Sequence, residues 1–241
     1  MVLHYDGSFE GYLTAVFLTY RHKDDAAFIC GFTEPQLGLV EYLQVTTDEE
    51  LASRVRLKLE GFSDNLLRRL YYAWLSREAD IEQDILAYIR LSVEQQRDVF
   101  EQRQINPVRH VLNAAHKVYR EIGHYVQFIR FIRVGETIYL ADIEPEYDIL
   151  ESLVGSFTDR LEGFRFLIRD KTRRKALVLD QKQFWISYDP VLLAPPTPAP
   201  GRYEQLWQTY FTHIAIPERI NFNLQTLHVP KRYRKFMTEF T

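Results

Sequence analysis

Basic side chains gather in two places in the second half of the sequence, and cations of this kind bind phosphate groups. The first group, which follows an apolar stretch, consists of Arg169, Lys171, Arg173, Arg174 and Lys175. The second group lies close to the C-terminus and includes an aromatic ring: Lys231, Arg232, Tyr233, Arg234 and Lys235. Cations neutralise the phosphates of nucleic acids, and aromatic rings stack on unpaired bases. We therefore predict that these ten residues bind nucleic acid, in particular single-stranded or damaged DNA.

The same residues have a plainer interpretation, as a solvated surface whose aromatic rings anchor the C-terminal segment to the core. Isolated basic runs are common, and neither group has the spacing of a known nucleic-acid-binding motif. Both groups nevertheless lie in the basic part of the chain. Residues 1–100 contain 10 Lys and Arg against 17 Asp and Glu, a net charge of −7, whereas residues 101–241 contain 20 against 16, a net charge of +4. This asymmetry favours a phosphate-binding surface in the second half and leaves an acidic half for a different partner.

Glu121 and His124 form the best candidate pair for acid–base or metal chemistry. They are three positions apart, so they are neighbours on one face of a helix, like half of a carboxylate-bridged dimetal site. A second such pair is missing from the sequence. A structural histidine or a surface ion pair is therefore the favoured interpretation, and we predict no metal site.

Asp6 and Ser8 lie where a first strand is expected to lead into a helix. Phosphates bind at such positions, but Asp6 and Glu10 would oppose an anion there. A turn and helix cap is the favoured interpretation, with a catalytic Asp6 or Ser8 as the alternative. No Gly-x-Gly-x-x-Gly, P-loop or Gly-x-Ser-x-Gly motif occurs, which argues against a nucleotide-dependent enzyme of a familiar type.

Composition limits the remaining possibilities. The chain of 241 residues is 46% hydrophobic, enough for a sizeable buried core. Its single cysteine, Cys30, rules out an internal disulfide and cannot by itself hold an iron–sulfur cluster. We find no signal-peptide pattern and no apolar run of the roughly 18 residues that a membrane span needs. We therefore predict a cytoplasmic protein with no membrane partner.

The elements that must position these residues can be predicted from apolar spacing. Val2–Tyr5 is expected to be a strand, followed by a helix with Ser8 as its N-cap. Two more strands are expected within residues 27–46. Helices are expected from Asp48 onward, and the last of them opens at Asn106 with a proline at its first helical position.

Strand patterns return in the second half, as two hairpins within residues 128–142 and 164–179. Strands that are adjacent in sequence and joined by short turns imply antiparallel pairing. We therefore predict an α+β fold with a mainly antiparallel sheet, a helical layer over about residues 48–126, and a C-terminal helical tail.

The domain boundaries follow from the prolines. Residues 189–201 contain five of the ten prolines and predict an extended linker after a core of residues 1–188. Residues 202–241 are then a basic, helical tail that docks on the core. We expect an amphipathic helix over Leu206–Ile214 and a last short helix that Pro230 opens.

Three motifs, in this order and spacing, resemble a bacterial family that carries the label "probable DNA metabolism protein". They are Tyr5–Gly11, Lys117–Glu121 leading into Phe128–Phe131, and Ile216–Asn221 with His228–Tyr233. The resemblance spans nearly the whole chain. This chain departs from the pattern at Gly123, where relatives often have histidine, and at Arg234, where they tend to have tryptophan.

The resemblance implies DNA repair or modification. Members of that family are typically encoded beside a radical-SAM protein, and some are fused to a uracil-DNA-glycosylase-like domain. It thus implies a radical-SAM partner that holds the iron–sulfur cluster and SAM, with no cofactor bound by this chain. Because the chain ends at Thr241, we expect any base excision to belong to a separate uracil-DNA-glycosylase-like protein.

Our leading hypothesis is an accessory protein of DNA repair or modification that binds nucleic acid and acts with the radical-SAM partner. We do not expect it to be an enzyme on its own. One alternative is an enzyme acting on DNA or a nucleotide through Asp6, Ser8, Glu121 or His124. The other is a non-catalytic protein-interaction scaffold whose tail packs on its own core.

Overall fold

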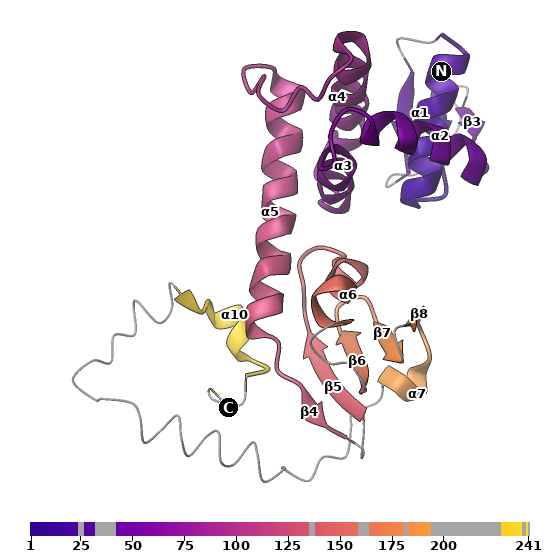
Figure 1. Ribbon diagram of the computed structural model, residues 1–241. Coiled ribbons are helices and arrows are strands. Elements are labelled where there is room, and N and C mark those ends of the chain that lie inside the picture. The colour runs from indigo at the N-terminus through magenta and orange to yellow at the C-terminus, as the bar shows by residue number, and fades with distance from the viewer. Residues whose placement is uncertain are drawn as a thin grey trace. The chain divides into compact units, whose positions relative to one another are not determined.

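The computed structural model describes residues 1–23, 27–31, 42–134, 138–158, 164–180, 183–193, 228–237 and 240 (Figure 1). The chain divides into two compact units, Met1–Tyr119 and Arg120–Thr241. The division falls within helix α5 (Asn106–Phe128), a boundary that the sequence did not indicate. Helices combined with one parallel and one mixed sheet confirm the predicted α+β class.

The first unit contains a three-stranded parallel sheet. Its central strand β1 (Val2–His4) pairs with β2 (Phe28–Cys30) on one side and β3 (Tyr42–Gln44) on the other. The expected antiparallel pairing is therefore wrong for this sheet. Parallel strands need a crossover, which α1 (Phe9–Arg21) provides between β1 and β2. The two later strands flank β1 and do not pair with each other.

Helix α1 begins where the sequence predicts. The Ser8 hydroxyl accepts the backbone N–H of Gly11 at 2.9 Å, which caps the first turn. The apolar side of the helix, with Tyr12, Leu13 and Val16, is fully buried.

The remainder of the first unit is helical, as predicted from Asp48 onward. Asp48 caps α2 (Glu49–Glu60) by accepting two backbone N–H groups. Helices α3 (Leu66–Leu75) and α4 (Ile81–Gln95) follow, and then the first part of α5. Leu66, Leu70 and Ile85 have no exposed surface.

The second unit contains a five-stranded mixed sheet in the order β4-β5-β6-β7-β8. Its strands are β4 (Ile132–Arg133), β5 (Ile138–Ile143), β6 (Arg165–Asp170), β7 (Lys175–Asp180) and β8 (Gln183–Ser187). The two predicted hairpins, β4/β5 and β6/β7, are present and antiparallel, and β7 also pairs antiparallel with β8. Strands β5 and β6 are parallel, because α6 (Leu150–Thr158) lies in the crossover between them.

Apolar side chains of α6 pack on this sheet. Val154 and Phe157 of the helix line a small apolar space together with Phe166, Ile168 and Leu177 of β6 and β7. The core of the second unit therefore lies between α6 and these two strands.

The predicted linker begins as a helix. Pro190 opens the short α7 (Pro190–Leu193), and the Asp189 carboxylate accepts the N–H of Val191 at 2.8 Å. The extended-linker prediction is thus wrong for residues 190–193. Residues 194–201 of the linker, and the predicted helix over Leu206–Ile214, lie outside the described residues.

The last short helix is present where it was predicted. Helix α10 (Lys231–Arg234) follows Pro230. Tyr233 and Met237 are buried, with 3% and 2% of their surfaces exposed.

Candidate nucleic-acid interface

Four acidic residues alternate along the chain from the end of β5 onward: Asp142, Glu144, Glu146 and Asp148. We refer to them as the acidic strip. Each of them forms an ion pair with a residue predicted to bind nucleic acid. The strip therefore decides how much positive charge the two basic groups present to a ligand.

The most buried pair joins neighbouring parallel strands. Arg169 of β6 donates from Nε and Nη2 to the two carboxylate oxygens of Asp142 on β5, at 2.6 and 2.8 Å. Only 4% of Arg169 is exposed. Lys175 is similarly buried, and its Nζ lies 2.6 Å from Oδ2 of Asp148. These two cations are structural in this arrangement, because each is almost fully buried and a phosphate could reach it only by displacing the carboxylate that it already binds.

Arg173 joins the hairpin turn to the backbone of the acidic strip. Its guanidinium donates to the carbonyl oxygens of Pro145 and Glu146, at 3.1 and 2.6 Å, and to Asp170 at 3.0 Å. Asp170 is fully buried and also accepts two backbone N–H groups of the turn. Arg173 thus stabilises the turn rather than presenting its charge freely.

Cations of the C-terminal group are paired at the surface. Lys235 lies 2.7 Å from Glu144, and Arg232 lies 3.2 Å from Glu146. The Lys235 and Arg232 side chains remain 58% and 47% exposed. Arg234 donates to the carbonyl oxygen of Val229 at 2.9 Å. Such solvent-exposed pairs are weak and exchange readily.

The two basic groups meet at one aromatic ring. Lys171 Nζ lies 5.9 Å from the centroid of Phe236, and Lys235 Nζ lies 5.3 Å from it. Lys171, Arg174 and Lys231 are exposed, and none of them forms an ion pair with a carboxylate in the described part of the chain. We call Lys171, Arg174, Lys231, Lys235 and Phe236 the basic-aromatic surface.

Glu121 is buried and structural. It is 1% exposed and accepts the backbone N–H groups of Glu146 and Tyr147, at 3.0 and 2.9 Å. Arg232 of α10 lies 3.4 Å from the same carboxylate. Both oxygens of Glu121 therefore hold the acidic strip and the C-terminal segment in place.

His124 contacts the same C-terminal segment through Tyr233. The Tyr233 hydroxyl lies 3.1 Å from Nδ1 of His124 and accepts from Arg232 at 2.5 Å. It can then donate to a neutral His124. Burial, and next the positive charges of Arg120 and Arg232, lower the pKa of His124, which favours that neutral form. The tyrosine ring packs edge-on against Tyr125 and His124.

The structure thus joins two sets of residues that were predicted to have separate roles, the Glu121/His124 pair and the C-terminal basic group. Glu121, His124, Arg232 and Tyr233 form one continuous network. Within the described residues, no group of three or more His, Cys, Asp or Glu side chains is arranged to hold a metal ion. The network is arranged to position the C-terminal segment.

Asp6 and Ser8 belong to the other unit. Asp6 accepts the N–H and the hydroxyl of Ser8, at 2.9 and 2.5 Å, and the hydroxyl of Thr47 at 2.7 Å. Burial raises the pKa of the Asp6 carboxyl, but these hydrogen bonds outweigh it and the net pKa is lowered. A Cβ on Gly11 would lie 2.3 Å from Asp6 Oδ1, so the motif requires glycine there. This arrangement is the turn and cap that the sequence favours.

Sequence reasoning missed the acidic strip. The sequence does contain a pattern that could have predicted this strip, because it has an acidic residue at every second position. In extended backbone this spacing places the side chains on one side. The acids lie far along the chain from the cations that they bind, 27 positions for Asp142 and Arg169 and 91 for Glu144 and Lys235, so the composition of each basic group does not reveal them.

The fold and the site define an α+β protein in which a C-terminal segment is held by a network of ion pairs. The family model of a domain of unknown function, DUF4130, matches residues 79–239, and the chain belongs to this family. The match includes the acidic strip and both basic groups. No curated protein matches the sequence. In the part of the chain that is described, every helix is too short or too polar to cross a membrane.

Proposed function

We propose that the protein is an accessory component of DNA repair or modification that binds nucleic acid through the basic-aromatic surface. The observation that carries the proposal is the meeting of two basic segments at Phe236, since Lys171 and Lys235 both lie over its ring. Exposed cations beside an aromatic ring suit a phosphate backbone and an unpaired base.

The proposed contact residues are fewer than the ten in the sequence-based prediction. Lys171, Arg174 and Lys231 have no carboxylate partner among the described residues and supply the phosphate contacts. Lys235 and Arg232 can exchange exposed carboxylates for phosphates. Arg169, Arg173 and Lys175 act by holding the strands and the turn.

A salt titration tests the proposal. Binding of fluorescent single-stranded and duplex oligonucleotides is measured by anisotropy at several salt concentrations. We expect log affinity to fall linearly with log salt concentration, and single strands to bind more tightly because their bases are free to stack. An absence of binding at low salt would remove the proposal.

A radical-SAM protein is the proposed partner, and it would supply the iron–sulfur cluster and SAM. Support comes from the family resemblance and from the single cysteine of this chain, Cys30, which is buried. Co-purification of the two proteins, with and without DNA, tests this part. Failure to associate under both conditions would contradict the partnership and leave DNA binding by this chain untouched.

A protein-interaction scaffold is the second candidate, and the acidic strip favours it. Because Asp142, Glu144, Glu146 and Asp148 neutralise five of the predicted cations, two of them in the described end of the tail, these cations would serve to hold the unit together. A scaffold would bind its partner normally while showing no salt-dependent affinity for oligonucleotides.

A further inference from the structure

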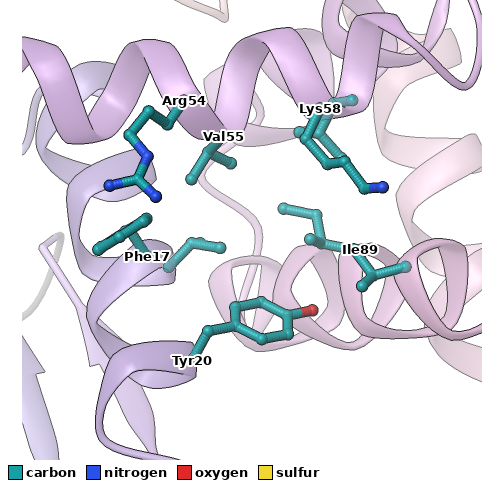
Figure 2. Close-up of a pocket in the computed structure, with 9 residues that line it drawn as sticks. Phe17, Tyr20, Arg54, Val55, Lys58 and Ile89 are labelled. Atoms are coloured by element: carbon teal, nitrogen blue, oxygen red, sulfur yellow. The ribbon is translucent and has the colours of Figure 1, made fainter.

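The first unit contains an apolar cleft that the DNA-binding proposal does not use. Helices α1, α2 and α4 surround about 230 Å³ of space. Its walls are Val16, Phe17, Tyr20, Val55, Leu59, Ile89 and Val93. Figure 2 shows Phe17, Tyr20, Val55 and Ile89 around this space, contributed by three different helices. A hydrocarbon group bound here would be shielded from water by all three helices, and the removal of its apolar surface from water would favour binding.

Two cations stand at the rim of this cleft. Arg54 and Lys58 are one helical turn apart on α2 and complete its lining (Figure 2). Arg54 lies over the ring of Phe17, 4.8 Å from the centroid, and Lys58 donates to Gln96 at 3.0 Å. Neither side chain forms an ion pair with a carboxylate among the described residues. Among the described residues their neighbours are neutral, namely the rings of Phe17 and Phe62 and the amide of Gln96, so both side chains keep their full positive charge.

The size of the cleft favours a small ligand over a protein. Only nine residues line it, whereas a stable protein–protein interface uses about 20–30 residues on each side. Pockets for small molecules are apolar, with a few polar groups that orient the ligand. The apolar walls match a short hydrocarbon body, and the cations match an anionic head.

We propose that this cleft binds a small amphiphilic anion, with its apolar body between α1, α2 and α4 and its acidic head at the rim, beside Arg54 or Lys58, whose charged groups lie at opposite sides of the cleft (Figure 2). The site is independent of the basic-aromatic surface, which belongs to the other unit. A charged head beside a cation at the surface is stabilised only modestly, so the apolar contacts supply most of the affinity.

Octanoate is a suitable probe, with octan-1-ol and acetate as controls for its two halves. Each compound is titrated into the full-length protein, and binding is followed by NMR as changes in the chemical shifts of the backbone amides. We expect shifts in α1, α2 and α4 with octanoate, binding up to about tenfold weaker with octan-1-ol, and no shifts with acetate. Shifts confined to other residues, or equal binding of octanoate and octan-1-ol, would overturn the proposal.

Two variants make the test specific. In R54Q/K58Q, octanoate should bind no better than octan-1-ol does. In V55W, the larger side chain should fill the cleft and abolish binding of both. The other possible occupant of the cleft is a second copy of this chain. Sedimentation of the wild type and of R54Q/K58Q tests this possibility. If the wild type is a dimer and the variant a monomer, the cleft is an interface between copies and the proposal is wrong.

Discussion

Nη2 of Arg232 lies 3.4 Å from Oε1 of Glu121, a side chain that is only 1% exposed, whereas Arg232 itself is 47% exposed. A surface cation from the last helix therefore compensates a buried acid of α5. This contact joins the C-terminal motif to the motif around Glu121 within the second unit. It also gives Arg232 a structural role, in contrast to the exposed cations that are proposed to bind nucleic acid.

Replacing Arg232 with Gln should destabilise the second unit. Glu121 would keep its two backbone donors but lose its charged partner, at a cost of about 1–2 kcal/mol for a half-exposed pair. The free energy of unfolding in urea measures this cost. Lys231→Gln is the matched control, because Lys231 is exposed and has no described carboxylate partner. Equal effects of the two substitutions would contradict the role given to Arg232.

Substitutions of Tyr233 compare the stability that its buried ring contributes with the stability that its hydroxyl group contributes. Tyr233→Phe removes the hydroxyl between His124 and Arg232 and should cost about 1 kcal/mol. Tyr233→Ala also removes a buried ring and should cost about 3–5 kcal/mol. Thermal unfolding of both variants measures the difference. A small loss of stability in Tyr233→Ala would show that the C-terminal segment does not dock as described.

Arg169 and Arg174 should behave in opposite ways. Arg169→Gln removes a buried guanidinium and leaves the partly exposed Asp142 without its partner, so we expect a loss of about 2–3 kcal/mol. Arg174 is exposed and has a φ of 52°, a left-handed conformation that glycine adopts more easily. Arg174→Gly should therefore keep or raise stability by up to about 1 kcal/mol. Denaturation curves that rank the two variants the other way would contradict the assignment.

Local features could be predicted from the sequence because their causes are local. Ser8 and Asp48 cap helices through N–H groups two or three residues away, and the β6/β7 hairpin follows from its own apolar pattern. Contacts between distant residues could not be predicted in this way. Lys235 pairs with Glu144 across 91 positions, and no spacing rule connects such residues.

The same reasoning explains the candidate site. Glu121 and His124 were correctly placed on one helix, because their spacing alone determines that. Their partners, Glu146 and Tyr233, come from segments 25 and 109 positions away. The parallel pairing of β1 was missed for a related reason, since three-residue strands carry too little pattern to indicate their neighbours.

His124 should make stability depend on pH. Its pKa is lowered from 6.5, by burial first and then by Arg120 and Arg232, so the unfolded state binds the proton more readily. The contribution of His124 is complete above 6.5 and is lost as pH falls through the lowered pKa of the folded state. Arg120→Gln should raise that pKa and reduce this loss. An NMR titration of the His124 ring measures the pKa, and a value above 6.5 in the wild type would contradict the described environment.

The central claim is that exposed cations of the basic-aromatic surface, and not the buried ones, bind nucleic acid. The most direct measurement is the slope of log affinity against log salt concentration for a single-stranded oligonucleotide. We compare the wild type with K171Q/R174G/K231Q, and with R97Q/R103Q/R109Q, which removes equal charge from exposed positions of the other unit. The first variant should lose about 2 from the slope, at about 0.7 per phosphate contact, while the control keeps the wild-type slope. Equal slopes for all three proteins would contradict the claim.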